Sequence, residues 1–174
     1  MEKRVARIDV EMPEKQFCHD IAELLNEYYG DKEPKEKVYF AGPWFDDRAL
    51  YLYNNVRFVL KKFSNLKVYF PQEHTAITPK KTFRDNVKNI QEADLVIALI
   101  DRKDTGTAWE IGLAQGLGKK ILLVGIDEDT FKSTTNIMLA FCAPAVLLKN
   151  LVSYLLTRDE KYLYHVKNTW EGKQ

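Results

Sequence analysis

A carboxylate close to the start of a short helix is the feature of this sequence best suited to chemistry. Residues 94–125 predict an apolar strand (95–100), a polar loop, a helix over about 107–117 and a second apolar strand (121–124). Glu110 falls in the first turn of that expected helix. In α/β folds the helix N-termini gather at the carboxyl edge of the sheet, where ligands bind. We therefore expect Glu110 to act on a bound ligand.

A purely structural role for Glu110 is the first alternative. The segment Thr107-Ala-Trp-Glu110 has the spacing of a capping box, in which the two outer side chains bind each other's backbone amides. Two neighbours favour chemistry instead. Asp104 lies six residues before Glu110, and Gly106 between them permits an unusual turn. The whole pattern, rather than the single carboxylate, indicates an active site.

This segment resembles the active-site segment of the nucleoside 2-deoxyribosyltransferase family, whose nucleophilic glutamate lies in the pattern G-x-x-x-E-(I/L/V)-G, here Gly106 to Gly112. The resemblance implies that Glu110 attacks C1′ of a 2′-deoxynucleoside, expels the base and holds a deoxyribosyl ester until a free nucleobase or water takes the sugar. Such a double displacement retains configuration. Deoxyribose is the easier substrate because a 2′-hydroxyl destabilises an oxocarbenium-like transition state. This chemistry implies no cofactor and no metal.

The resemblance extends over about residues 37–148 and includes the first expected strand and the loop after it. Residues 39–45, Tyr-Phe-Ala-Gly-Pro-Trp-Phe, are similar to the part of the family in which a tyrosine hydroxyl orients the catalytic glutamate. The orienting role then belongs to Tyr39, and the substrate site includes Gly42, Trp44 and Phe45. Taken alone, a tyrosine in a strand is more often a core residue.

Two further matches concern substrate binding. Asp104 matches the family's aspartate that takes part in substrate binding near the sugar and base, with Gly106 beside it, although a lone loop aspartate is usually a solvated turn residue. Asn136-Ile-Met138 resembles an N-x-M element that a neighbouring subunit contributes to the sugar pocket; its ordinary interpretation is a helix cap followed by a core methionine. The match implies a homo-oligomer, a dimer or a multiple of dimers, with sites shared between subunits.

One position departs from the pattern of many family members, which carry an aspartate that helps to protonate the leaving base. Asn86 stands there, as in the trypanosomal branch of the family, and Asp85 lies one residue early. One residue on a helix rotates the side chain by about 100 degrees, so Asp85 does not simply substitute. An amide binds a base edge but supplies no proton. The proton then comes from Asp104, Asp85, water or a base that accepts protons readily, and the preference for purine or pyrimidine stays open.

Composition narrows the class of protein. The 174 residues are 45% hydrophobic, enough for one core, and 26 Lys and Arg nearly balance 25 Asp and Glu. This balance argues against nucleic acid and anionic membranes as partners and favours a small ligand. No apolar run is long enough for a membrane span, and the N-terminal residues lack the apolar core of a signal peptide, so we expect a cytoplasmic protein. Cys18 and Cys142 lack metal-ligand spacing and are expected to be reduced.

The expected architecture is a flavodoxin-like, doubly wound, five-stranded parallel sheet with an extra N-terminal helix. Residues 1–36 form a helical extension, and residues 37–174 form the α/β domain. Strands are expected at the start of that domain and at 66–70, 95–100, 121–124 and 145–148, alternating with helices. The helix that starts at Thr78-Pro79 is expected to bury one stripe, formed by Phe83, Val87 and Ile90.

Two rival functions remain. The first is an N-glycoside hydrolase of deoxynucleosides or deoxynucleoside 5′-monophosphates, but the bulky, apolar loop 42–45 argues against a phosphate. The second is a non-catalytic nucleotide-binding module, which has no need for Tyr39, Asp104 and Glu110 together. Of the three histidines, His74 alone is expected to line the site, and none has ligand spacing with the cysteines.

Overall fold

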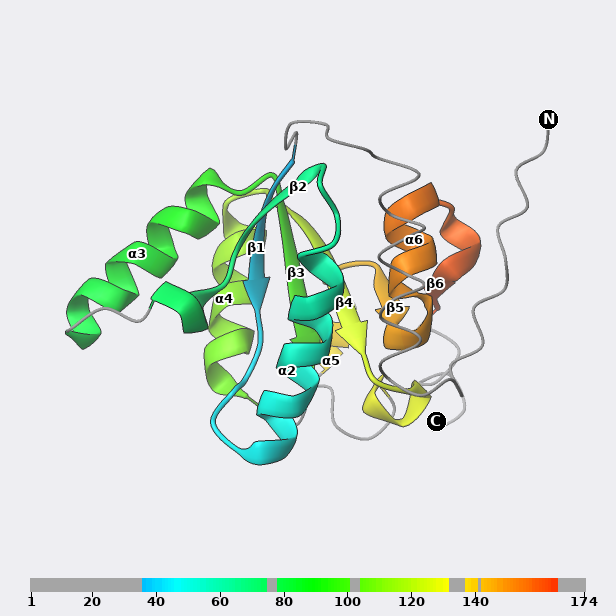
Figure 1. Cartoon of the computed structure of the whole chain (residues 1–174), viewed down its shortest axis with the longest axis horizontal. Helices are drawn as coiled ribbons and strands as arrows, with labels where there is room; N and C mark the ends of the chain where they lie inside the picture. Colours follow the sequence, from blue (N-terminus) through cyan, green and yellow to red (C-terminus); the bar gives the residue numbers. More distant parts are fainter. Residues whose placement is uncertain (1–35, 75–77, 101–103, 132–136, 141, 166–174) are drawn as a thin grey trace.

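The computed structural model describes residues 36–74, 78–100, 104–131, 137–140 and 142–165 (Figure 1). Residues 1–35 of the expected N-terminal extension lie outside this part of the chain, and so does Asn136. In chain order the elements are β1 (Glu36–Ala41), α2 (Asp47–Leu60), β2 (Leu66–Tyr69), η1 (Pro71–His74), α3 (Pro79–Glu92), β3 (Leu95–Ile100), α4 (Thr105–Gly116), β4 (Lys120–Gly125), α5 (Ile137–Ala140), β5 (Ala145–Leu147), η3 (Leu148–Asn150), α6 (Leu151–Thr157), η4 (Glu160–Tyr162) and β6 (Leu163–Tyr164).

Five parallel strands form the sheet, in the order β2-β1-β3-β4-β5. This is the strand order of flavodoxin-like doubly wound folds, so the predicted fold class is confirmed. The two-residue strand β6 adds an antiparallel edge beside β5, which the sequence did not indicate. Across β1, Tyr39 lies opposite Tyr69 of β2 on one side and Val96 of β3 on the other.

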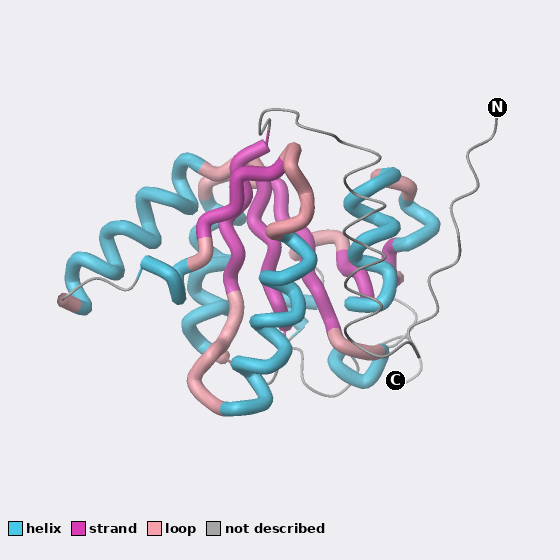
Figure 2. Tube along the Cα trace, in the orientation of Figure 1, coloured by secondary structure: helices cyan, strands magenta, loops and turns pink. Residues whose placement is uncertain are grey.

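Helices cover both faces of the sheet, which explains why its central strands are continuous apolar runs. All six residues of β3 are buried. Helices α2 and α6 pack on one face through residues such as Val56 and Leu151, and α3 and α4 pack on the other through Ile90 and Ile111 (Figures 1 and 2). Burying each such side chain contributes about 2 kcal/mol. Among the described helices, none combines the length and the apolar composition that a bilayer span requires.

Helix α3 differs from its prediction. Ile90 is buried, but Val87 is only partly buried and Phe83 is 54% exposed, because the first turns of α3 extend beyond the sheet (Figure 1). The expected buried stripe is therefore wrong at its N-terminal end. The physical reason is that β2 is a short edge strand, so no strand lies beneath those turns. Phe83 instead contacts Trp109 of α4, with the ring centroids 5.4 Å apart.

Candidate active site

The site lies where the chain leaves two neighbouring strands in opposite directions. After β1 the chain runs to α2 on one face of the sheet, and after β3 it runs to α4 on the other face. In flavodoxin-like folds this point between β1 and β3 opens a crevice at the carboxyl edge, where ligands bind. Tyr39 comes from β1, and Glu110 comes from α4, the helix that follows β3.

The start of α4 corrects one prediction. Asp104, not Thr107, caps the helix: its Oδ2 accepts a hydrogen bond from the Thr107 amide at 2.6 Å. Both residue types cap helices, and aspartate is the stronger cap. The capping box is therefore wrong, and Glu110 lies in the second turn of α4 rather than the first. Glu110 has no capping task and faces the sheet beside Ile111 and Ala114, which are buried.

Tyr39 and Glu110 form the tightest contact of the site. The Tyr39 hydroxyl donates a hydrogen bond to Glu110 Oε1 at 2.5 Å, across 71 positions of sequence. Tyr39 is fully buried. Burial, followed by the charge of Glu110, raises the pKa of Tyr39 well above its usual range, so the hydroxyl keeps its proton and acts as the donor. Such a short O–H···O⁻ bond is typical of a charge-assisted pair.

The ionisation of Glu110 is shifted toward neutral pH. Burial raises the pKa of Glu110 to about 7, the hydrogen bond from Tyr39 opposes that rise, and the negative charge of Asp104 adds to it. The structure thus brings Tyr39, Asp104 and Glu110 together. Gly106 fits closely beside the cap, because a Cβ there would lie 3.3 Å from Asp104 Oδ2. A carboxylate that ionises near pH 7 is suited to act as a nucleophile or a base at that pH.

Asn86 belongs to a second group of side chains. Its Oδ1 accepts a long, 3.5 Å hydrogen bond from the Tyr69 hydroxyl. The Tyr69 ring stacks on Tyr39 at 5.7 Å and on His74 at 4.6 Å. His74 therefore borders the group through Tyr69. Asp85 faces a different partner, since it forms an ion pair with Lys81 at 2.8 Å.

Sequence reasoning missed Tyr69, although the chain contains a signal for it. The triplet Val-Tyr-Phe occurs at 38–40 in β1 and again at 68–70 at the end of β2. Parallel pairing places the two triplets in register, with Val38 opposite Val68 and Tyr39 opposite Tyr69. Because in-register residues share a face of the sheet, the repeat indicates that both tyrosines point toward α3 and α4.

The loop after β1 turns to the α2 face of the sheet. Gly42 permits a close approach, because a Cβ there would lie 3.1 Å from the Leu99 Cβ. Trp44 packs against Tyr53 in the core beneath α2, with centroids 5.5 Å apart, whereas Tyr39 belongs to the opposite core. Phe45 is 76% exposed.

The N-x-M element is described in part. Met138 lies in α5 and is 76% exposed. Asn136 lies outside the described residues.

Two aromatic side chains on the α3 and α4 side, Phe83 and Trp109, are about half exposed, at 54% and 47%.

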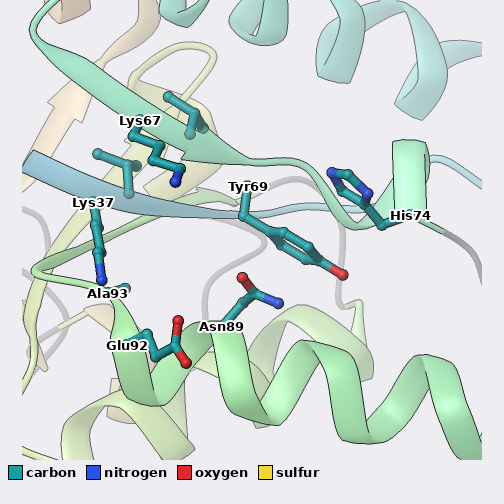
Figure 3. Close-up of a pocket in the computed structure, with 9 residues that line it drawn as sticks. Lys37, Lys67, Tyr69, His74, Asn89, Glu92 and Ala93 are labelled. Carbon is teal, nitrogen blue, oxygen red and sulfur yellow. The ribbon is translucent and has the colours of Figure 1, made fainter. Parts of the chain in front are cut away.

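A cavity of about 290 Å³ lies beside this group, between β2 and α3 (Figure 3). Tyr69 and His74 line it. The other polar side chains of the lining are Lys37 and Lys67, near the amino ends of β1 and β2, and Asn89 and Glu92 of α3. Glu110 and Tyr39 are not among its lining residues. Within the described chain, no group of three or more His, Cys, Asp or Glu side chains is arranged to hold a metal ion.

Comparison with known proteins identifies the family. A family model for nucleoside 2-deoxyribosyltransferases matches residues 38–162, well over half of the chain. The chain belongs to the nucleoside 2-deoxyribosyltransferase family. It is therefore an enzyme of the nucleoside deoxyribosyltransferase type, and the family acts on deoxynucleosides and nucleobases.

Individual relatives agree with this membership. A nucleoside deoxyribosyltransferase from Lactobacillus leichmannii is 27% identical over 116 residues, which cover 55% of this chain and 74% of that protein. A solved 2-deoxyribosyltransferase from Bacillus psychrosaccharolyticus has a TM-score of 0.60 at 23% identity and covers 71% of this chain and 92% of its own. A CMP N-glycosidase from Clostridium botulinum has a TM-score of 0.52 at 19% identity and covers 73% of this chain and 100% of its own. At such identities the two structures establish the fold alone.

Proposed function

We propose that this enzyme transfers a 2-deoxyribosyl group between nucleobases through a covalent ester on Glu110. The observation that carries the proposal is the 2.5 Å hydrogen bond from the Tyr39 hydroxyl to the Glu110 carboxylate. It holds one carboxylate oxygen in place at the edge of the sheet where ligands bind in this fold. Membership of the family supplies the substrate class, deoxynucleosides and free bases.

The reaction takes two displacements. Tyr39 holds Oε1 of Glu110, and Oε2 attacks C1′ of the deoxynucleoside. As the O–C1′ bond forms, the C1′–N bond breaks, and its electron pair leaves with the base, which takes up a proton. A ring nitrogen of the acceptor base then attacks C1′, the ester bond breaks, and Glu110 regains its charge. The proton of that ring nitrogen is released to water, which balances the proton taken up by the first base. Two inversions at C1′ give overall retention.

The surroundings of Glu110 favour this chemistry. Because burial raises its pKa to about 7, a large fraction of Glu110 is ionised at neutral pH, while its poor solvation leaves it a better nucleophile than an exposed carboxylate. Asp104 uses Oδ2 for the helix cap, which leaves Oδ1 to bind a hydroxyl of the sugar. No step in this scheme uses a metal or a cofactor.

The proton for the leaving base comes from water, because one oxygen of Asp104 accepts the helix-cap hydrogen bond and the other is assigned to the sugar. Asp85 is disfavoured because its carboxylate is paired with Lys81 at 2.8 Å on the outer part of α3. Asn86 is a neutral amide and supplies no proton. Its proposed role is to bind the edge of the base.

We also propose that the enzyme is a cytoplasmic homo-oligomer built from dimers, in which Asn136 and Met138 of one chain complete the sugar pocket of its partner. The exposure of Met138, 76%, supports this arrangement. Phe83 of α3 and Trp109 of α4 form an exposed aromatic pair, and Trp109 directly precedes Glu110 in the sequence. Exposed apolar surface of this kind is typical of subunit contacts.

Incubation of the purified protein with deoxyinosine, with and without adenine, tests the proposal. We expect deoxyadenosine only when adenine is present. Free deoxyribose as the sole product identifies a hydrolase instead. A deoxynucleoside 5′-monophosphate serves as a parallel substrate, which the apolar loop 42–45 should exclude. Failure to cleave any of these substrates contradicts the proposal, and a folded Glu110→Ala variant controls for contaminating activity.

A further inference from the structure

Tyr69 connects the two groups of side chains in the candidate site. Its ring lies between two others: the Tyr39 ring at 5.7 Å with an interplanar angle of 18°, and the His74 ring at 4.6 Å with an angle of 11°. Figure 3 shows Tyr69 reaching from β2 toward α3, with the His74 ring beside it. These two stacked neighbours restrict the ring, so its hydroxyl is held in one direction.

That hydroxyl contacts the one base-edge residue of the proposed site. The Tyr69 oxygen lies 3.5 Å from Asn86 Oδ1. Burial, together with the charges of Asp85 and Glu110, raises the pKa of Tyr69, so the hydroxyl keeps its proton and donates it to the amide oxygen. An asparagine whose oxygen is engaged in this way has both N–H donors of Nδ2 left for another partner.

We infer that Tyr69 is a positioning residue that sets the base specificity of the enzyme. By holding Asn86 Oδ1, it turns the amide N–H groups toward the base, so the site selects a base that presents an in-plane hydrogen-bond acceptor there, such as a ring nitrogen of a purine. The inference rests on the proposed function, because that function places the base at Asn86.

The arrangement also gives Asn86 a task that fits its chemistry. As the C1′–N bond breaks, negative charge develops on the departing base, and a fixed N–H donor stabilises that charge without transferring a proton. The contact of 3.5 Å is long in the free enzyme, and hydrogen bonds of this kind shorten when the ligand is in place.

Equilibrium binding of free bases tests the inference without any turnover. Isothermal titration with adenine, 3-deazaadenine and 7-deazaadenine compares the wild type, Tyr69→Phe, Asn86→Ala and the double variant. Each deaza base replaces one ring nitrogen by C–H. We expect one of the two to bind the wild type about tenfold more weakly than adenine, as the loss of one hydrogen bond predicts. In Tyr69→Phe and in Asn86→Ala that ratio should fall toward one, and the double variant should show no further fall.

The matched control is Tyr154→Phe, which removes a hydroxyl from another partly buried tyrosine, on α6 and away from the site. It should keep the wild-type ratio. Because Tyr69→Phe keeps the ring, the pH dependence of turnover through Glu110 should also stay unchanged.

Three results would overturn the inference. They are a wild type that binds all three bases alike, a Tyr69→Phe variant that keeps the wild-type ratio, and a Tyr69→Phe variant that binds all three bases equally more weakly, as a merely structural role predicts. A failed transfer assay with an intact pattern of binding ratios would instead refute the proposed transfer and leave the role of Tyr69 standing.

Discussion

The nucleophile end and the recognition end of the candidate site differ in how far the fold itself holds them. At the nucleophile end, Tyr39 is fully buried and its hydroxyl lies 2.5 Å from Glu110. At the recognition end, the contact to Asn86 of α3 is 3.5 Å long, and Phe45 and Met138 are each 76% exposed. The sheet thus preorganises the group that we assign to bond making, whereas we assign recognition to side chains of α3, α5 and the loop after β1, which a substrate or a second chain must complete.

Removing the nucleophile should have the largest effect. Glu110→Ala should lower kcat by at least about a thousandfold, because within the described residues Tyr39 donates its hydroxyl hydrogen bond to Glu110 and to no other carboxylate. Circular dichroism should show an unchanged fold. Turnover near the wild-type rate in a folded variant would refute the assignment of the nucleophile.

Mixed oligomers test whether two subunits share each site. Glu110→Ala and Asn136→Ala should each be weak or inactive alone, but a mixed dimer collects both lesions in one site and leaves the other intact. Random co-assembly should recover roughly a quarter of the wild-type sites, since half of the dimers are mixed and half of their sites are intact. If tagged pull-down shows subunit exchange and activity still does not rise, the sites are not shared.

Loss of the Tyr39 hydroxyl should lower activity through its effect on Glu110 at the nucleophile end. Tyr39→Phe should reduce kcat/KM about tenfold at neutral pH. The hydrogen bond from Tyr39 lowers the pKa of Glu110, so its loss raises that pKa, and the rise of activity with pH should move to higher pH. Tyr53 is a fully buried tyrosine in the opposite core, and the control variant Tyr53→Phe should keep the pH profile of the wild type. A profile that does not move in Tyr39→Phe would show that this bond does not govern the ionisation of Glu110.

Changing the base-edge residue should alter selectivity more than rate. Asn86→Asp introduces a group that can carry a proton, so the pH dependence of base release and the ratio of purine to pyrimidine rates should both change, by about tenfold or less. Kinetics with deoxyadenosine and deoxycytidine over pH 5–8 would measure both. Identical profiles for the variant and the wild type would place Asn86 outside the site.

A separate prediction concerns stability rather than turnover. Burial raises the pKa of Glu110 from 4.5 to about 7 in the folded chain, so wild-type stability falls as pH rises between these values. The side chain in Glu110→Gln does not ionise, so the free energy of unfolding of this variant does not fall with pH in this way. The variant should be more stable than the wild type at pH 8, by roughly 3 kcal/mol at most. Below about pH 4.5 the two should be equal. Urea unfolding at both pH values measures the difference, and equal stability at pH 8 would mean that Glu110 is solvated.

The sequence was sufficient for the features that depend on local pattern. The apolar run of β3, the alternation of strands and helices, and the spacing of Asp104, Gly106 and Glu110 are local, and they led to the fold class and the family. The start of α4 was mistaken because Asp104 and Thr107 are both good caps three residues apart, and only the three-dimensional path of the loop decides between them.

Other features depend on where distant segments meet. Phe83 fits a buried stripe, but its exposure follows from where the sheet ends beneath α3. Trp44 turns to the α2 face because the loop after β1 bends that way. The position of Tyr69 follows from the register of β1 with β2. The roles of the site residues in catalysis and binding remain predictions.

Mass spectrometry of the enzyme after brief reaction with a slow deoxynucleoside tests the assigned nucleophile most directly. Peptide mapping of the acid-quenched protein should find one deoxyribosyl group, carried by the peptide that contains Glu110, and no such group in Glu110→Ala. Addition of a free base before quenching should remove the adduct and yield a new deoxynucleoside. An adduct on another residue, or rapid turnover with no adduct under any quench, would contradict the account.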